Sequence, residues 1–135
     1  MAKVVTNVTS RSMWKYVLPV RWWGPNDHTA SFTITAKMSG GTFTNRGASG
    51  GIVFTLPSAP KGTRFTFAVV TADELDVAPP TGGRLEYNGA GTWASHAADK
   101  VARGDTLADC ITFVSKGSND YMAVNQTGTW TDTSP

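Results

Sequence analysis

Apolar and polar residues alternate along most of this chain with a period of two, whereas a helix would show a spacing of about 3.6 residues. In the run 31–36, for example, Phe32, Ile34 and Ala36 fall on one side, and serine and threonine fall on the other. Further stripes of this kind are Ile52, Phe54 and Leu56; Phe65, Phe67 and Val69; Leu85 and Tyr87; and Leu107, Ile111 and Phe113. Because the side chains of a strand point alternately to its two faces, each stripe predicts one wall of a half-buried sheet.

Turn signals separate these stripes at short intervals. Glycine, proline and asparagine gather at 24–27, 39–41, 47–51, 57–62, 79–83, 88–91, 103–105 and 116–120. Short strands at such spacing predict an all-β protein made of a single antiparallel β-sandwich or jelly-roll-like domain. In one stretch, 94–101, a helix and a short strand over 99–102 are both compatible with the pattern.

The first 40 residues differ from the rest of the chain. Seven large apolar residues lie within ten positions, and Pro19, which has no amide donor, argues against a central strand there. We therefore predict an extended N-terminal arm or edge segment over 1–40 and a sandwich core over 41–135, forming one domain overall. In an extended chain Trp22 and Trp23 point in opposite directions. Burial of both within this domain, and contact of one of them with a second chain, stay open.

Composition supports a β structure and excludes several other classes. Charged residues make up only 16%, against about 25% in a typical soluble domain, and nineteen threonines and fourteen glycines take their place. No apolar run reaches the length of a membrane span, and the first residues lack the hydrophobic segment of a signal peptide. The lone Cys110 cannot form an internal disulfide, which favours synthesis in a reducing cytoplasm.

Charge is distributed unevenly along the chain. Residues 1–67 carry eight basic side chains and one acidic one, whereas residues 68–135 carry four basic and nine acidic ones. Two arrangements are compatible with this asymmetry. The halves can neutralise each other across the sandwich, or a basic surface of one molecule can meet an acidic surface of another.

Residues that carry chemistry do not form a convincing catalytic pattern. The stretch 47–51 fits the Gly-x-Ser-x-Gly form of a nucleophile elbow around Ser49, with Asp73 or Asp76 and then His96 in hydrolase order. An elbow needs a helix after the serine, but a strand-like run follows here.

Asp73, Glu74 and Asp76 offer carboxylates for glycoside hydrolysis or calcium, although their spacing matches no known calcium loop and suits a solvated turn. His28 and His96 lie in turn-like contexts, where a surface position is expected. We predict no catalytic residue, no metal, no cofactor and no enzymatic activity.

Aromatic and basic residues are interleaved in the first 25 positions. Such stretches hold single-stranded nucleic acid in some proteins, and exposed tryptophans hold sugars in others. We favour a segment packed against a neighbouring protein, without direct contact to nucleic acid or membrane. Aromatic residues and arginine are the usual anchors of protein interfaces. The predicted interface residues are Trp14, Tyr16, Arg21, Trp22 and Trp23.

Residues 41–131 resemble a pattern found in small proteins of bacteriophage particles. The pattern consists of an Asn-x-Gly-Ala turn at 45–48, a strand that ends in Leu56-Pro57, a Gly-x-x-Phe-x-Phe strand at 62–67, a Gly-Asp-Thr strand start at 104–106 and a closing Gly-Thr-Trp at 128–130. The best-matching description is the capsid decoration, or cement, proteins of tailed phages. The chain departs from the pattern at 121–124, where a tryptophan is expected, and residues 1–40 match nothing in it.

The resemblance implies a structural protein of the virion. A decoration protein binds the outside of the phage head, contacts the major capsid protein and stabilises the shell against the internal pressure of packaged DNA. Such proteins self-associate, commonly as homotrimers. The alternative that the resemblance allows is a tail-fibre module, or a receptor- or glycan-binding β-module of a phage tail.

Overall fold

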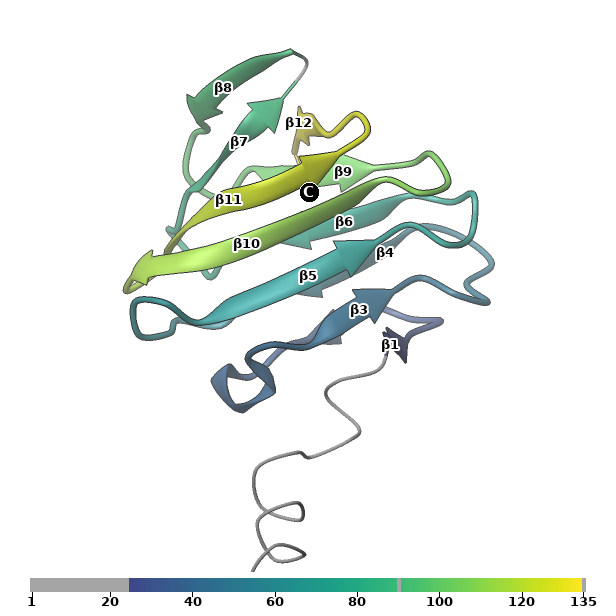
Figure 1. The fold of residues 1–135 in the computed structure, drawn as a ribbon, viewed down its shortest axis with the longest axis horizontal. Helices are drawn as coiled ribbons and strands as arrows, with labels where there is room; N and C mark the ends of the chain where they lie inside the picture. Colours follow the sequence, from purple (N-terminus) through teal and green to yellow (C-terminus); the bar gives the residue numbers. More distant parts are fainter. Residues whose placement is uncertain (1–24, 90, 135) are drawn as a thin grey trace, which may run out of the picture.

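The computed structural model describes residues 25–89 and 91–134 and shows an all-β protein (Figure 1). Twelve strands follow one another along this part of the chain, and one turn of 3-10 helix, Ala36–Met38, lies between the second and third. No α-helix occurs within these described residues. The strands form two sheets whose inner faces share one hydrophobic core, so the predicted β-sandwich is confirmed.

The two sheets differ in size. The larger has seven strands in the order β1-β3-β5-β10-β11-β7-β8, and the smaller has five in the order β12-β9-β6-β4-β2. The strands of the larger sheet are β1 (Pro25–Asp27), β3 (Thr42–Thr44), β5 (Arg64–Ala68), β7 (Leu85–Gly89), β8 (Thr92–Ser95), β10 (Cys110–Gly117) and β11 (Asp120–Thr127). The strands of the smaller sheet are β2 (Phe32–Thr33), β4 (Ile52–Thr55), β6 (Leu75–Ala78), β9 (Val101–Gly104) and β12 (Thr131–Thr133).

The chain changes sheet after each of its first six strands. As a result β1, β3 and β5 lie next to one another in the larger sheet, and β2, β4 and β6 do so in the smaller, all with parallel pairing. This half of the molecule is a flattened coil. The later strands complete the sheets with antiparallel pairs, apart from β7, which runs parallel to β11.

This mixed pairing differs from the antiparallel, jelly-roll-like arrangement expected from the sequence. A half-buried strand alternates with a period of two whether its neighbours run parallel or antiparallel, so the apolar pattern does not reveal strand direction. Turn composition does not reveal strand direction either. The turn after β3 leads into β4 of the opposite sheet, although its glycines would equally suit a hairpin that joins two strands of one sheet.

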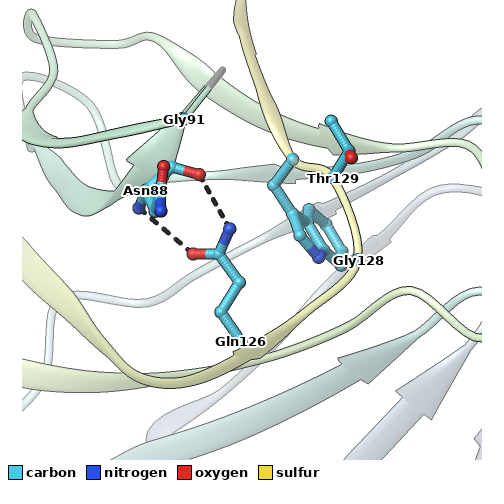
Figure 2. A pocket seen from close by; sticks show the side chains of 6 residues that line it. Asn88, Gly91, Gln126, Gly128 and Thr129 are labelled. Carbon is cyan, nitrogen blue, oxygen red and sulfur yellow. Dashed lines mark hydrogen bonds between the residues drawn. The ribbon is translucent and has the colours of Figure 1, made fainter.

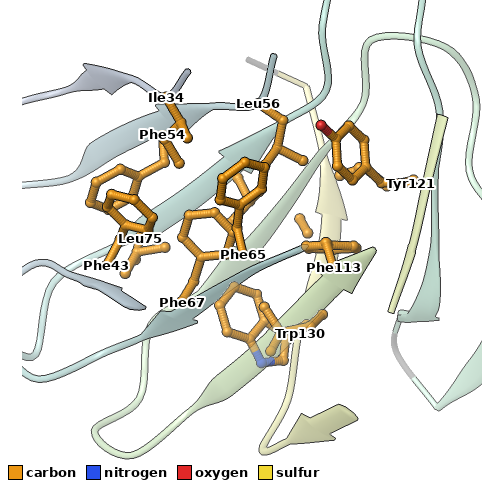
Figure 3. Packing of buried hydrophobic residues seen from close by; sticks show 14 of the residues in the cluster. Ile34, Phe43, Phe54, Leu56, Phe65, Phe67, Leu75, Phe113, Tyr121 and Trp130 are labelled. Atoms are coloured by element: carbon orange, nitrogen blue, oxygen red, sulfur yellow. The ribbon is translucent and has the colours of Figure 1, made fainter. Parts of the chain in front are cut away.

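Aromatic rings fill much of the space between the sheets (Figure 3). The ring centroid of Phe43 lies 5.8 Å from those of both Phe54 and Phe67, and the latter two are 5.5 Å apart. Complete burial of one such side chain contributes about 2–3 kcal/mol. The predicted stripes identified most of this core. Their buried members are Ile34, Ile52, Phe54, Leu56, Phe65, Phe67, Val69, Leu85, Tyr87, Ile111 and Phe113.

Two local predictions were wrong, and one open alternative is decided. Leu107 was placed in a buried stripe but is 57% exposed, because the chain turns at Ala108, which has a φ of 76°, before β10 begins. Residues 25–27 were taken for a turn but form β1, with a proline at the first position of an outermost strand. For stretch 94–101 the strand alternative holds in part: β8 ends within the stretch, β9 begins at Val101, and no helix lies between them.

The predicted boundary after residue 40 does not coincide with a break in the structure. Within the predicted arm, β1 and β2 pair with the sandwich strands β3 and β4, and Ile34 belongs to the common core. Residues 25–40 are thus part of the sandwich. Residues 1–24 lie outside the described part of the chain.

Asn45, at the start of the predicted Asn-x-Gly-Ala turn, holds two loops together at one end of the sandwich. Its side chain is fully buried and makes four hydrogen bonds. The amide nitrogen donates to the carbonyl oxygens of Thr71 (2.9 Å) and Asp73 (3.0 Å), and the amide oxygen accepts from the backbone N–H of Val70 (2.9 Å) and of Thr71 (3.0 Å). The turn after β3 is therefore fastened to the loop between β5 and β6.

Candidate interaction surface

The outer face of the larger sheet carries apolar side chains that the core does not use. Alternation sends Phe65 and Phe67 of β5 inward, and the same rule turns Val114 of β10 and Met122 of β11 outward. These last two are register partners in neighbouring strands and are both partly exposed. They form the centre of a partly apolar sheet face.

A β-bulge adds a more exposed residue to this face. Thr112 pairs with Asn125, whereas the next residue, Phe113, pairs with Ala123, so Val124 has no partner across the β10–β11 ladder. The side chain of Val124 is 51% exposed. A bulge of this kind re-aims a side chain at the cost of one ladder position.

Trp93 lies on β8, at the far edge of the larger sheet, opposite Asn88 of β7. Tryptophan offers a large contact area, and this one is 50% exposed. In Figure 1 the β7–β8 hairpin flares away from the body of the sandwich. We call Val114, Met122, Val124 and Trp93 together the apolar face.

Polar contacts border the apolar face. Lys116 of β10 forms an ion pair with Glu86 of β7, and because β11 lies between these strands, the pair must cross over it. The hydroxyl groups of Thr66 and Thr112, which are register partners, are 2.8 Å apart and hydrogen-bonded. An apolar centre with a polar border is typical of protein interfaces.

A pocket of about 140 Å³ opens where the β7–β8 hairpin leaves the sandwich (Figure 2). It is lined by Asn88, Gly91, Gln126, Gly128, Thr129 and Trp130. The side chain of Gln126 takes the place of missing strand pairing: its amide nitrogen donates to the carbonyl of Asn88 (2.7 Å), and its amide oxygen accepts from the Asn88 N–H (3.1 Å). A side chain thus joins β11 to β7 after their backbones have diverged.

His96 lies beside this pocket and is largely buried, which contradicts the surface position expected from the sequence. Its ring packs against that of Tyr87 at a tilt of 31°, with 4.2 Å between the centroids. Nδ1 lies 3.5 Å from the Asp132 carboxylate, and Nε2 lies 3.3 Å from the Tyr87 carbonyl oxygen. Burial, followed by the charges of Asp132 and Asp76, raises the pKa of the Tyr87 hydroxyl. His96 connects the end of β8 to β12.

His28 is also less exposed than predicted. It lies just after β1, with its ring 4.3 Å from Phe32 and edge-on to Phe54 at 5.3 Å. Burial lowers the pKa of His28, and the neighbouring Asp27 opposes this effect only in part. We assign His28 to the margin of the core.

The structure does not assemble the serine, acid and histidine pattern noted in the sequence. Ser49 is exposed, and strand β4 follows it where a nucleophile elbow would have a helix. Among the hydrogen bonds and ion pairs of the described residues, His96 contacts Asp132 and Asp76 contacts Arg103, and neither contacts Ser49.

The carboxylates at 73–76 diverge as well. Arg103 holds Asp76 through two hydrogen bonds, Nε to Oδ1 at 2.7 Å and a terminal guanidinium nitrogen to Oδ2 at 2.8 Å, and reaches Glu74 at 3.2 Å. The hydrogen bond to Asp76 raises the pKa of Arg103. In residues 25–89 and 91–134 no group of three or more histidine, cysteine or acidic side chains is arranged to hold a metal ion.

The predicted interface residues Trp14, Tyr16, Arg21, Trp22 and Trp23 lie outside the described residues. The apolar face itself was missed. Trp93 was overlooked because its neighbours were assigned to an ambiguous helix or strand, and the exposure of Val124 depends on a bulge that no local signal marks. The available hint in the sequence was an apolar residue directly before the polar pair Asn125–Gln126.

Comparison with known proteins returned no matching family model and no matching curated protein. Among the described residues, no helix is long and apolar enough to cross a membrane.

Proposed function

We propose that this chain is a structural, non-catalytic protein of a bacteriophage particle that decorates the outside of the head and stabilises it. The observation that carries this proposal is the apolar face, which lies on a tightly hydrogen-bonded sheet and leaves Trp93 and Val124 half exposed. A half-exposed tryptophan and valine on one sheet face are suited to burial against another protein. The occupant we propose is the major capsid protein.

The motif residues on which the resemblance to decoration proteins rests have structural roles in this chain. Asn45 fastens two loops, and Trp130 packs so closely over Gly104 that a Cβ atom there would lie 3.0 Å from the indole. The motif thus describes a scaffold and contains no reactive group. A rigid scaffold that repeats many weak contacts by symmetry is how a decoration protein adds stability to a shell.

Binding to phage heads tests this function directly. Heads that lack the chain are mixed with the purified full chain, sedimented and analysed for bound copies. We expect hundreds of copies per head and greater resistance of the heads to heat. Trp93→Ser and Val124→Ser should each weaken binding, because each removes apolar area from the contact.

Val53→Ser is the matched control, since Val53 is a partly exposed valine on the outer face of the opposite sheet. It should bind like the unmodified chain. Failure of the unmodified chain to bind heads, or equal loss with all three variants, would refute the proposed contact.

A second candidate, a receptor- or glycan-binding module of a phage tail, is favoured by the pocket beside Gln126. Amide and hydroxyl groups of Asn88, Gln126 and Thr129 line it, and sugars are bound by such groups together with aromatic rings. Copy number separates the two candidates, because a tail module is present in few copies. It should also bind a glycan array, and Gln126→Ala should abolish that signal.

A further inference from the structure

Acidic and basic residues of this protein are segregated along the strand direction. All odd-numbered strands run toward one end of the sandwich and all even-numbered strands run toward the other, as the pairings and the connections between sheets require. The loops that follow odd-numbered strands therefore share one end, and those that follow even-numbered strands share the opposite end. Figure 1 shows β5 and β10 pointing in opposite directions.

Acidic residues dominate the end reached by the odd-numbered strands, which we call the acidic end. It holds six acids and two bases in loops or near strand termini: Asp27, Asp73, Glu74, Asp76, Asp105, Asp109, Arg46 and Arg103. Both arginines are already engaged within the chain. Arg46 pairs with Asp27 at 3.2 Å, and Arg103 pairs with Asp76 and Glu74. Within residues 25–89 and 91–134, ion pairs with lysine or arginine involve neither Asp73 nor Asp105.

Basic residues dominate the opposite end, which we call the basic end. It holds six bases and three acids: Lys37, Lys61, Arg64, Arg84, Lys100, Lys116, Glu86, Asp99 and Asp120. Two of these acids are used locally, because Asp99 accepts the N–H of Gly82 at 2.6 Å and Asp120 accepts that of Arg84 at 3.0 Å. Lys37, Lys61 and Arg64 are exposed and take part in no ion pair among the described residues.

The two ends cannot neutralise each other inside one molecule. The longest strands have eight residues, which corresponds to a length of about 25 Å. That separation exceeds the screening length of about 8 Å at physiological ionic strength. The chain asymmetry seen in the sequence is therefore not cancelled by one half facing the other, since both sheets contain strands from both halves. Contact between molecules is what brings the opposite charges together.

We propose that the acidic end of one copy binds the basic end of a second copy, so that the protein associates head to tail. Leu107, which is 57% exposed between Asp105 and Asp109, supplies an apolar centre on the acidic side. The contact joins two different surfaces, and repetition of such a contact closes a ring or extends a filament according to the rotation between copies. The inference concerns the chain by itself and does not depend on binding to phage heads.

Charge reversal in the full chain tests the contact. One variant, Lys37→Glu with Lys61→Glu, makes both ends acidic. The other, Asp73→Lys with Asp105→Lys, leaves four acidic and four basic residues at the acidic end and so cancels the net charge of that end. Association is measured by sedimentation velocity over a range of protein concentrations, at about 50 mM and about 500 mM salt. The unmodified chain should associate at low salt and dissociate at high salt.

Each variant alone should lose at least about tenfold in self-affinity, because like charges meet at the contact in the first variant and the attraction is cancelled in the second. An equimolar mixture should associate again, since the unaltered acidic end of the first variant can bind the unaltered basic end of the second. Circular dichroism should be unchanged, because all four side chains lie outside the buried core.

Three outcomes would overturn the proposal. The first is an unmodified chain that stays monomeric at low salt. The second is a mixture that fails to associate although both variants are folded. The third is loss of association on Lys3→Glu with Arg11→Glu together with no effect of the Lys37 and Lys61 reversals. That result would show that the acidic end binds the sequence before Pro25, which contains four basic residues and no acid.

Discussion

Removal of the Asn45 side chain should destabilise the protein more than its size suggests. Asn45→Ala deletes four hydrogen bonds at once and leaves two backbone N–H groups and two carbonyl oxygens of the 70–73 loop without these partners. A typical hydrogen bond contributes about 1 kcal/mol net, and an unpaired buried group costs about 1–3 kcal/mol. Because water can reach part of this loop, we take the lower value for each bond and expect a loss of about 4 kcal/mol.

Urea denaturation followed by tryptophan fluorescence measures this loss. The midpoint should fall without a change in slope, because the surface exposed on unfolding stays nearly the same. Asn125→Ala is the control, because Asn125 is exposed and its side chain makes no hydrogen bond within the described part of the chain. Its replacement should change stability by less than about 0.5 kcal/mol.

Asn45→Asp probes the direction of the hydrogen bonds. An ionised aspartate keeps the two acceptor contacts to Val70 and Thr71 but turns an oxygen toward two carbonyl groups. Stability of this variant should rise as pH falls and the carboxyl takes up a proton, since a protonated carboxyl can donate one bond. A loss below about 1 kcal/mol for Asn45→Ala would refute the reasoning that this side chain fastens the two loops.

Three further predictions concern pH and backbone conformation. His28 has a lowered pKa when folded, so the unfolded chain takes up its proton first as pH falls below 6.5, and stability should drop there; His28→Phe should remove this part of the pH dependence. Gly128→Ala should cost at least about 2 kcal/mol in thermal unfolding, because φ is 82° and a Cβ atom would lie 1.8 Å from the Asp109 carboxylate. Tyr121 has a pKa raised to about 12 by burial and donates to the Pro57 carbonyl at 2.6 Å, so stability should be lost as pH rises from 10 toward 12, and less so in Tyr121→Phe.

Each of these predictions has a direct counter-result. Gly62→Ala shares the positive φ, at 94°, but has open space around the added atom, so it should cost less than Gly128→Ala; equal costs would show that the contact with Asp109 is unimportant. If stability falls with acid equally in His28→Phe and in the unmodified chain, groups other than His28 cause the acid sensitivity. If stability falls with alkali equally in Tyr121→Phe and in the unmodified chain, groups other than Tyr121 cause the alkaline sensitivity.

The apolar faces of the strands were predictable because their cause is local. A strand with one solvent-exposed face must alternate apolar and polar residues, whichever strands it pairs with. Phe54 and Phe67 are buried as that rule requires. Strand direction and sheet membership depend on partners far along the chain. Phe54 pairs with Phe32 and Val77, and the sequence around it contains no signal for either.

The surface features were harder to predict for the same reason. His96 is buried because Asp132, 36 residues later, lies against it. Val124 is exposed because the ladder with β10 slips by one residue between Thr112 and Phe113. Leu107 continued an apolar stripe in the sequence but lies before β10 begins at Cys110. Local alternation thus identifies buried positions well and positions next to a bulge or turn poorly.

The flattened coil of the first six strands has a consequence for how this protein can vary in length. Phe32 and Phe54 are neighbours across a ladder, as are Phe54 and Val77, so each circuit of the coil takes about 22 residues and lays down one strand in each sheet. Insertion or loss of a whole circuit would widen or narrow both layers together and leave every later pairing in register. A sandwich wound in this way can change its breadth in steps, whereas one built from hairpins would have to alter each layer separately.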